Sequence, residues 1–128
     1  MFSHVTIGVQ DFARALSFYD AALAPLGIMR VPGTKYTGWA SWQRTGHAET
    51  LWVGKPQNGQ PASHGNGWMA AFTAPSRAAV NEAYAAAMAA GGTDEGAPGP
   101  RPQFAADYYG AYVRDPDGNK LHFVTREN

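Results

Sequence analysis

The sequence predicts an α+β protein made of two tandem βαβββ modules within a single domain. The order strand, helix, three strands is predicted twice along the chain. A shift of about 65 positions places Tyr19 on Tyr84 within the two predicted helices, and an internal repeat of this kind decides the architecture. We therefore expect module one over residues 1–56, a linker over residues 57–66 and module two over residues 67–128.

The composition is that of a globular chain without a charge bias. Of 128 residues, 45% are hydrophobic and 16% charged, and cysteine is absent, which excludes disulfides and thiolate chemistry. Ten basic and ten acidic residues cancel, which argues against a nucleic acid or an anionic membrane as partner. The chain has no predicted signal peptide and no membrane span. We expect a cytoplasmic protein that binds a small molecule.

Module one opens with a strand and a helix. Residues 3–9 alternate, with Val5 and Ile7 on one face and His4 on the other. Asp11 is a predicted N-cap, after which apolar residues recur at helical spacing. The further strands of this module are predicted at residues 28–31, 38–43 and 50–53.

Module two repeats this order. A strand is predicted at residues 68–74, and Ser76 is the predicted N-cap of a helix that ends at a Gly-Gly pair. Residues 96–103 contain three prolines and two glycines, which predicts a segment poor in regular structure. Two closing strands, at residues 108–114 and 120–125, flank an Asp-Pro-Asp-Gly-Asn turn, so its aspartates are predicted to be structural.

The tandem pattern resembles the vicinal oxygen chelate superfamily, as do the opening SHVTIGVQDFARALSFYDAAL and the closing YYGAYVRDPDGNKLHFV. That group comprises glyoxalase I, fosfomycin- and bleomycin-resistance proteins and extradiol dioxygenases. The resemblance covers essentially the whole chain. It implies a curved mixed sheet around a concave pocket, and often a homodimer. Because one fold hosts several chemistries, it does not select a reaction.

The resemblance also implies a metal site with ligands from the first and last strands of a module. The matching positions hold His4, Trp52, Met69 and His122. Imidazoles at His4 and His122 would suit Zn, Ni, Fe or Mn. Met69 stands where a histidine is expected and His122 where a carboxylate is expected. A thioether is a poor ligand for these ions, so we expect the site to be incomplete because of Met69.

Three other side chains are weaker candidates for the missing ligand: His47, Glu49 and His64. Glu49 precedes a predicted strand, but its odd offset from Trp52 would turn it to the other face. His47 and His64 lie in turn-rich segments and are expected to be solvated. None of the three is predicted as a ligand.

Aromatic and basic residues are the candidates for substrate binding. The chain has four tryptophans in or beside predicted strands, and aromatic walls suit a flat or apolar ligand. Trp42 and Tyr112 are assigned to equivalent positions of the two modules. The predicted substrate-binding residues are Trp42, Trp52, Met69, Arg101, Tyr109 and Tyr112.

Two classes of function remain open. The first is a glyoxalase-like lyase or isomerase, in which a divalent metal would chelate the vicinal oxygens of a small substrate. An Fe(II) dioxygenase is disfavoured because its triad needs a carboxylate where His122 stands. The second class is a non-catalytic binding protein of the bleomycin-resistance type with a degenerate metal site. The two histidines favour the enzyme, whereas Met69 and the tryptophans favour the binding protein.

Overall fold

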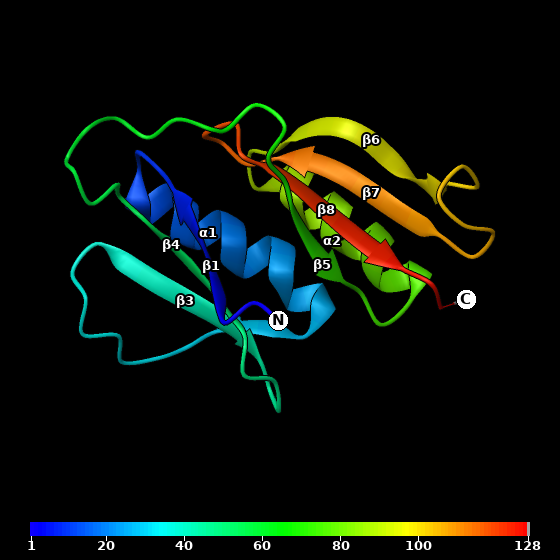
Figure 1. The fold of residues 1–128 in the computed structure, drawn as a ribbon, viewed down its shortest axis with the longest axis horizontal. Helices are drawn as coiled ribbons and strands as arrows, with labels where there is room; N and C mark the ends of the chain where they lie inside the picture. Colours follow the sequence, from blue (N-terminus) through cyan, green and yellow to red (C-terminus); the bar gives the residue numbers. More distant parts are fainter. Residues whose placement is uncertain (128) are drawn as a thin grey trace.

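The computed structural model describes residues 1–127 and contains two βαβββ modules, as predicted (Figure 1). Module one consists of β1 (His4–Gly8), α1 (Phe12–Leu23), a short 3-10 helix η1 (Ala24–Leu26), β2 (Ile28–Arg30), β3 (Trp39–Arg44) and β4 (Thr50–Gly54). Module two consists of β5 (Ala70–Thr73), α2 (Arg77–Ala89), β6 (Thr93–Pro100), β7 (Tyr109–Arg114) and β8 (Lys120–Thr125).

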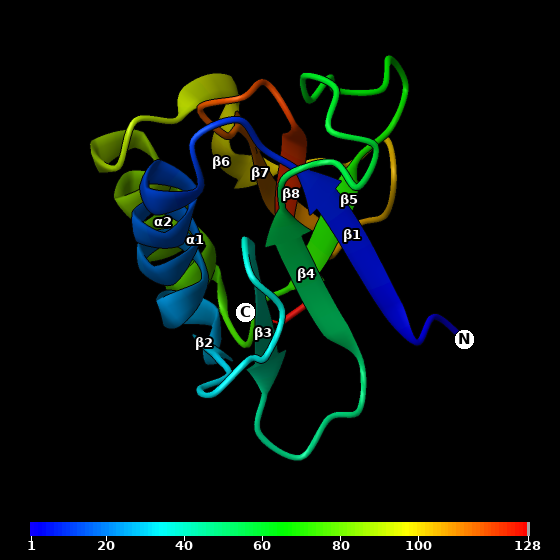
Figure 2. The same cartoon turned by 90° about the vertical axis from the view of Figure 1, so that its left-hand side faces the viewer.

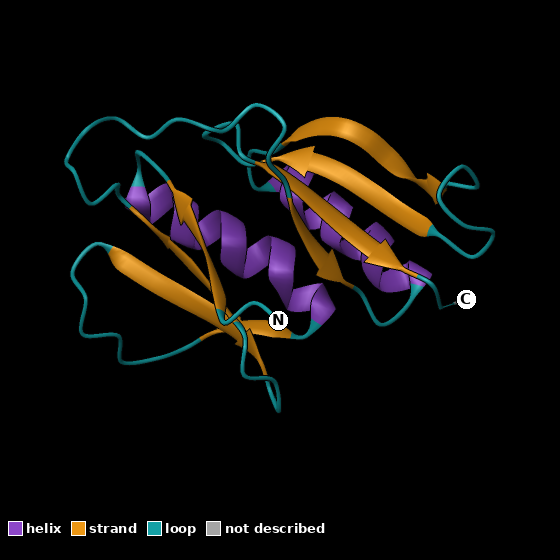
Figure 3. Cartoon of the chain, viewed as in Figure 1, coloured by secondary structure: helices purple, strands orange, loops and turns teal. Residues whose placement is uncertain are grey.

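Each module has its own four-stranded mixed sheet. The strand orders are β1-β4-β3-β2 and β5-β8-β7-β6, so the same topology occurs twice. In both sheets the first strand pairs in parallel with the last strand, and the other pairs are antiparallel. Both helices lie on the same side of the two sheets and pack against each other (Figures 2 and 3). Within residues 1–127, neither helix has the length and apolar character needed to cross a membrane.

Both helices begin at the predicted caps. The Asp11 side chain accepts a hydrogen bond from the Arg14 amide at 3.0 Å, and Ser76 accepts one from the Ala79 amide at 3.1 Å. The apolar faces of the helices then cover the sheets. Fully buried core side chains include Phe18, Leu23, Val53, Val80, Val113 and Phe123. Each large side chain of this kind contributes about 1.5–3 kcal/mol of hydrophobic stabilisation.

The turn between β7 and β8 joins the two modules. Asp115 is buried and its carboxylate accepts hydrogen bonds from the Tyr19 hydroxyl at 2.6 Å and from the Asn119 amide nitrogen at 2.8 Å. The Asn119 side chain also donates to the Gly8 carbonyl at 3.0 Å. Burial raises the pKa of Asp115, and it raises the pKa of Tyr19 well above its ordinary value. The predicted structural role of this turn is confirmed.

The prediction of irregular structure at residues 96–103 is wrong over residues 96–100, because β6 runs to Pro100. This strand lies at the edge of its sheet and pairs with β7 through two register shifts, between Asp94 and Gly96 and between Gly96 and Gly99. Prolines are tolerated in a strand where an edge or a bulge removes the need for their missing amide hydrogen.

Candidate functional site

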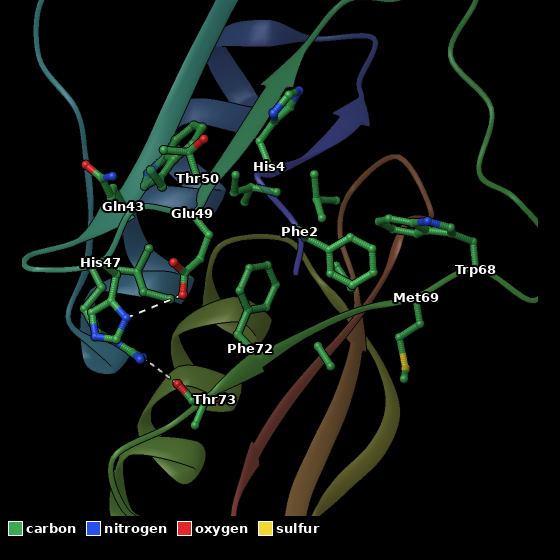
Figure 4. A pocket seen from close by; sticks show the side chains of 17 residues that line it. Phe2, His4, Gln43, His47, Glu49, Thr50, Trp68, Met69, Phe72 and Thr73 are labelled. Atoms are coloured by element: carbon green, nitrogen blue, oxygen red, sulfur yellow. Dashed lines mark hydrogen bonds and ion pairs between the residues drawn. The ribbon is translucent and has the colours of Figure 1, made fainter.

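A cavity of about 530 Å³ lies where module one meets β5, and we call it the seam cavity (Figure 4). Its apolar lining residues include Val5, Ile28, Trp42, Leu51, Ala70 and Phe72. Side chains nearer its mouth include Phe2, His4, His47, Glu49, Trp68 and Met69. His47 and Glu49 lie on one side of the cavity, and Trp68 and Met69 lie on the other.

The apolar lining follows from strand alternation. Val5 pairs with Leu51, which in turn pairs with Trp42, so these three side chains share the face of sheet one that looks toward the helices. In β5, Ala70 and Phe72 occupy the matching face of the second sheet. Apolar side chains of both modules therefore line the seam cavity.

The polar side of the cavity contains a histidine–glutamate pair. The Nδ1 atom of His47 lies 3.5 Å from Oε1 of Glu49. A hydrogen bond from its own backbone amide, aided by His47, lowers the pKa of Glu49. Sequence reasoning did not assign these two residues to a site. The available signal was that Glu49 has the same parity as Leu51, which lines the same cavity.

His4 lies at the rim of the seam cavity. Its side chain is exposed, and its Nδ1 atom lies 2.5 Å from the Ser3 hydroxyl oxygen. The ring points away from Phe72 and Met69 (Figure 4). His4 thus contributes to the boundary of the cavity with its imidazole turned outward.

His122 lies in a different environment, buried in the second sheet with an exposed fraction of 1%. Its Nδ1 atom lies 2.9 Å from the Ala111 carbonyl oxygen and its Nε2 atom 2.7 Å from the Tyr108 hydroxyl. A carbonyl only accepts, so Nδ1 carries the proton and Nε2 accepts from Tyr108. The ring stacks on Tyr112 with centroids 3.9 Å apart and an interplanar angle of 6°. Burial lowers the pKa of His122, so the neutral form is favoured.

The residues at the predicted metal positions do not fit a divalent ion. Both ring nitrogens of His122 are used within the protein, whereas His4 borders a cavity that His122 does not line. Met69 offers only a thioether, and its side chain is partly exposed at the cavity mouth. Among residues 1–127, no three His, Asp or Glu side chains are grouped closely enough to hold a metal.

The predicted substrate-binding residues lie in three different places. Trp42 and Met69 line the seam cavity, and Trp42 is fully buried with its Nε1 donating to Asp20 at 3.0 Å. Trp52 lies on the opposite face of its sheet, beside Tyr36. Three predicted residues do not line this cavity and lie instead in the second sheet or at its edge: Arg101, Tyr109 and Tyr112.

The assignment of Trp42 and Tyr112 to equivalent positions is wrong by one residue. Leu51 and Leu121 are equivalent in the repeat, but Leu51 pairs with Trp42 whereas Leu121 pairs with Val113. The β3–β4 connection is therefore one residue longer than the β7–β8 connection. A slip of one residue moves a strand side chain to the other face, which explains why Trp42 faces the core and Tyr112 faces away from it.

Comparison with known proteins identifies the class to which this fold belongs. The family model described as the Glyoxalase/Bleomycin resistance protein/Dioxygenase superfamily matches residues 1–123. The chain belongs to this superfamily. A search of curated proteins found no match.

A comparison with solved structures also finds members of this superfamily. A glyoxalase/bleomycin resistance protein from Albidiferax ferrireducens T118 is 42% identical, with a TM-score of 0.88 over 98% of both chains. A glyoxalase-related enzyme from Fulvimarina pelagi is 19% identical, with a TM-score of 0.75 over 98% of this chain and 87% of that chain. A glyoxalase/bleomycin resistance protein/dioxygenase family enzyme from Burkholderia phytofirmans PsJN is 17% identical, with a TM-score of 0.72 over 96% of both chains. The last two comparisons show the fold alone.

Proposed function

We propose that this chain binds an apolar, ring-containing small molecule in the seam cavity without the help of a metal ion. The observation that carries the proposal is the state of His122, whose two ring nitrogens are bonded to Tyr108 and Ala111. A histidine with both nitrogens bonded in this way contributes to the packing of the second sheet and has no nitrogen left for a metal ion. The ligand-binding capacity of the chain then lies in the cavity between the modules.

The size and lining of the seam cavity support this role. Its volume of about 530 Å³ falls within the roughly 300–1,000 Å³ typical of small-molecule sites. Phe72 and Trp68 give it accessible aromatic surface, against which a flat ring can stack, and Trp42 lies buried behind the lining. Polar side chains are the minority of its lining, which is the usual composition of a ligand pocket.

Tryptophan fluorescence tests the proposal directly, because Trp42 and Trp68 line the cavity. We expect naphthalene-type probes to quench this fluorescence with the same Kd before and after dialysis against EDTA. The variant Ala70→Phe, which places a bulky ring in the cavity lining, should weaken binding about tenfold or more. Binding that disappears with EDTA would contradict the proposal and favour a metal-dependent site.

A divalent-metal lyase or isomerase is the second candidate function. It is supported by the imidazole of His4 at the rim of the cavity and by the description of one structural relative as a glyoxalase-related enzyme. Metal analysis of protein purified without a chelating tag tests this candidate. Stoichiometric Zn, Ni, Fe or Mn, or a rise in Tm on adding Zn or Ni, would favour it.

The variant Met69→His tests whether the chain has a metal site that lacks only one ligand. If the ligand geometry is otherwise intact, this single change adds the missing imidazole and Zn should raise Tm. Because the nitrogens of His122 are already bonded, we expect no Zn-dependent shift in this variant.

We also propose that the chain is a cytoplasmic homodimer. The support is the apolar surface around the cavity mouth, where Phe2 is 70% exposed and Met69 is 40% exposed. Light scattering coupled to size exclusion should give twice the monomer mass of 13.7 kDa. Cell fractionation tests the location.

A further inference from the structure

Arg44 is a half-buried cation in the wall of the seam cavity. Its Nε and Nη2 atoms donate to the Leu26 carbonyl at 3.1 and 2.8 Å, and Nη2 also donates to the Thr73 carbonyl at 2.5 Å. Leu26 belongs to module one and Thr73 to module two, so the guanidinium is held across the seam. Its orientation is therefore fixed before any ligand binds.

The charge of Arg44 is not balanced by a carboxylate. Four other arginines form ion pairs with aspartate or glutamate: Arg14, Arg30, Arg114 and Arg126. Among residues 1–127, no carboxylate lies within ion-pair distance of Arg44, and its guanidinium donates to neutral carbonyls. A partly desolvated cation beside apolar surface is more stable when an anion approaches it.

The guanidinium still has a free edge. The bonds to Leu26 and Thr73 use Nε and Nη2, which leaves the two hydrogens of Nη1 for a ligand. The neighbouring apolar lining, which includes Phe72, would receive an apolar ring. A carboxylate attached to such a ring could meet Arg44 while the ring occupies the apolar part of the cavity.

The other charged groups of the cavity limit the ligand to a single negative charge. Glu49 is near the mouth, its side chain is 63% exposed, and it faces His47. A second anionic group that extended toward the mouth would be repelled by this carboxylate. His4 at the rim and His47 beside Glu49 are the remaining titratable groups of the lining.

From these observations we infer that the seam cavity selects aromatic monocarboxylates and that Arg44 is the residue that recognises the carboxylate. This inference rests on the proposed binding function and narrows it to a class of ligand. Charge-assisted hydrogen bonds between a guanidinium and a carboxylate are short and about twice as strong as neutral ones.

A matched ligand series tests the inference on the unmodified protein. We expect 2-naphthoate to bind about tenfold or more tightly than 2-naphthamide, which has the same ring and no charge. The cationic 2-naphthylmethylamine should bind more weakly than either. The preference for 2-naphthoate should shrink between low and high salt, because screening weakens the ionic contact.

Variants assign the preference to Arg44. Arg44→Gln removes the charge and should reduce the preference for 2-naphthoate over 2-naphthamide to about twofold or less, whereas Arg44→Lys should retain part of it. The control is Arg14→Gln, which alters an arginine that pairs with Asp117 outside the seam cavity and should leave the preference unchanged. Circular dichroism establishes that each variant is folded.

The outcomes distinguish the two levels of the proposal. Equal binding of naphthoate and naphthamide would overturn the selectivity and leave the binding function standing. Failure of all three probes to bind would overturn both. Should Arg44→Gln fail to fold, the ligand series and its salt dependence decide the question on the unmodified protein, and Arg44→Lys tests the residue.

Discussion

His122 shows how neighbours decide the chemistry of a single side chain. A strand histidine with free nitrogens can bind a metal, but this ring is stacked on Tyr112 and bonded at both nitrogens. Burial is the main cause of its lowered pKa, to which the positive charges of Arg101 and Lys120 add, while the bond to Ala111 works in the opposite direction. The ring is thereby kept as a neutral part of the sheet.

The lowered pKa of His122 makes stability depend on pH. Below the ordinary histidine pKa of about 6.5 the unfolded chain binds a proton that the folded chain does not, so the free energy of unfolding falls as pH decreases. We expect His122→Gln to lose less stability than the parent between pH 7.5 and pH 5.5, by up to about 1.4 kcal/mol per pH unit. Urea unfolding of both proteins at each pH measures this. Identical pH slopes would show that His122 is not held neutral.

At the scale of elements, the β7–β8 hairpin depends on a glycine that makes room for His122. A Cβ atom added to Gly110 would lie 2.5 Å from Cε1 of His122 and 3.0 Å from the Phe123 carbonyl oxygen. The imidazole therefore packs directly over the backbone of β7, and a larger residue at position 110 would displace it.

We expect Gly110→Ala to lower the free energy of unfolding by about 1–3 kcal/mol, because the ring or the strand must move. The control is Gly8→Ala in β1, where the nearest atom to an added Cβ is Cγ of Pro56 at 3.5 Å. That change should remain within about 0.5 kcal/mol. Chemical denaturation measures both, and equal effects would contradict the packing of His122 described above.

At the scale of the whole molecule, the two modules are joined at both ends of the seam. Arg44 spans it near the cavity, and the turn at Asp115 joins β8 to β1 and α1 at the other end. The Tyr19–Asp115 bond is buried between modules, whereas the similar Tyr84–Asp94 bond is exposed within module two. These two bonds provide a matched comparison.

We expect Tyr19→Phe to cost about 1.5–3 kcal/mol, because it removes a buried hydrogen bond to a carboxylate and leaves that carboxylate with only the bonds from the Asp117 and Asn119 amides and the Asn119 side chain. Tyr84→Phe removes an exposed bond and should cost less than about 1 kcal/mol. Thermal unfolding of the two variants measures the difference. A larger loss for Tyr84→Phe would show that the contact between modules contributes little.

Sequence patterns predicted most of the fold because helix caps and strand alternation depend on residues that are close together in the chain. Caps at Asp11 and Ser76 set the starts of the helices, and alternation placed Val5 and His4 on opposite faces of β1. The prediction failed at β6, where bulges and an edge position accommodate proline. It failed again at Trp42, because the β3–β4 connection is one residue longer than the β7–β8 connection and Trp42 therefore faces the core, unlike Tyr112.

The candidate site was less predictable because it is made by segments far apart in the sequence. The motif positions of His4 and His122 could be found from the chain, but not that one borders the seam cavity while the other is enclosed by Tyr108 and Tyr112. The cavity itself arises where β1 and β4 meet β5, and it brings Glu49 and Arg44 beside the apolar lining.

The amino-acid sequence alone was sufficient for the two modules, their helix starts and the identity of the motif residues, because these depend on neighbours along the chain. The packing of module one against module two decided the rest. It determined which tryptophans line the cavity and where the unpaired guanidinium of Arg44 lies, while the packing within module two engaged both nitrogens of His122. Local periodicity encodes the face of a strand but not the distance between two sheets, so only the tertiary structure could place Arg44 and the seam cavity.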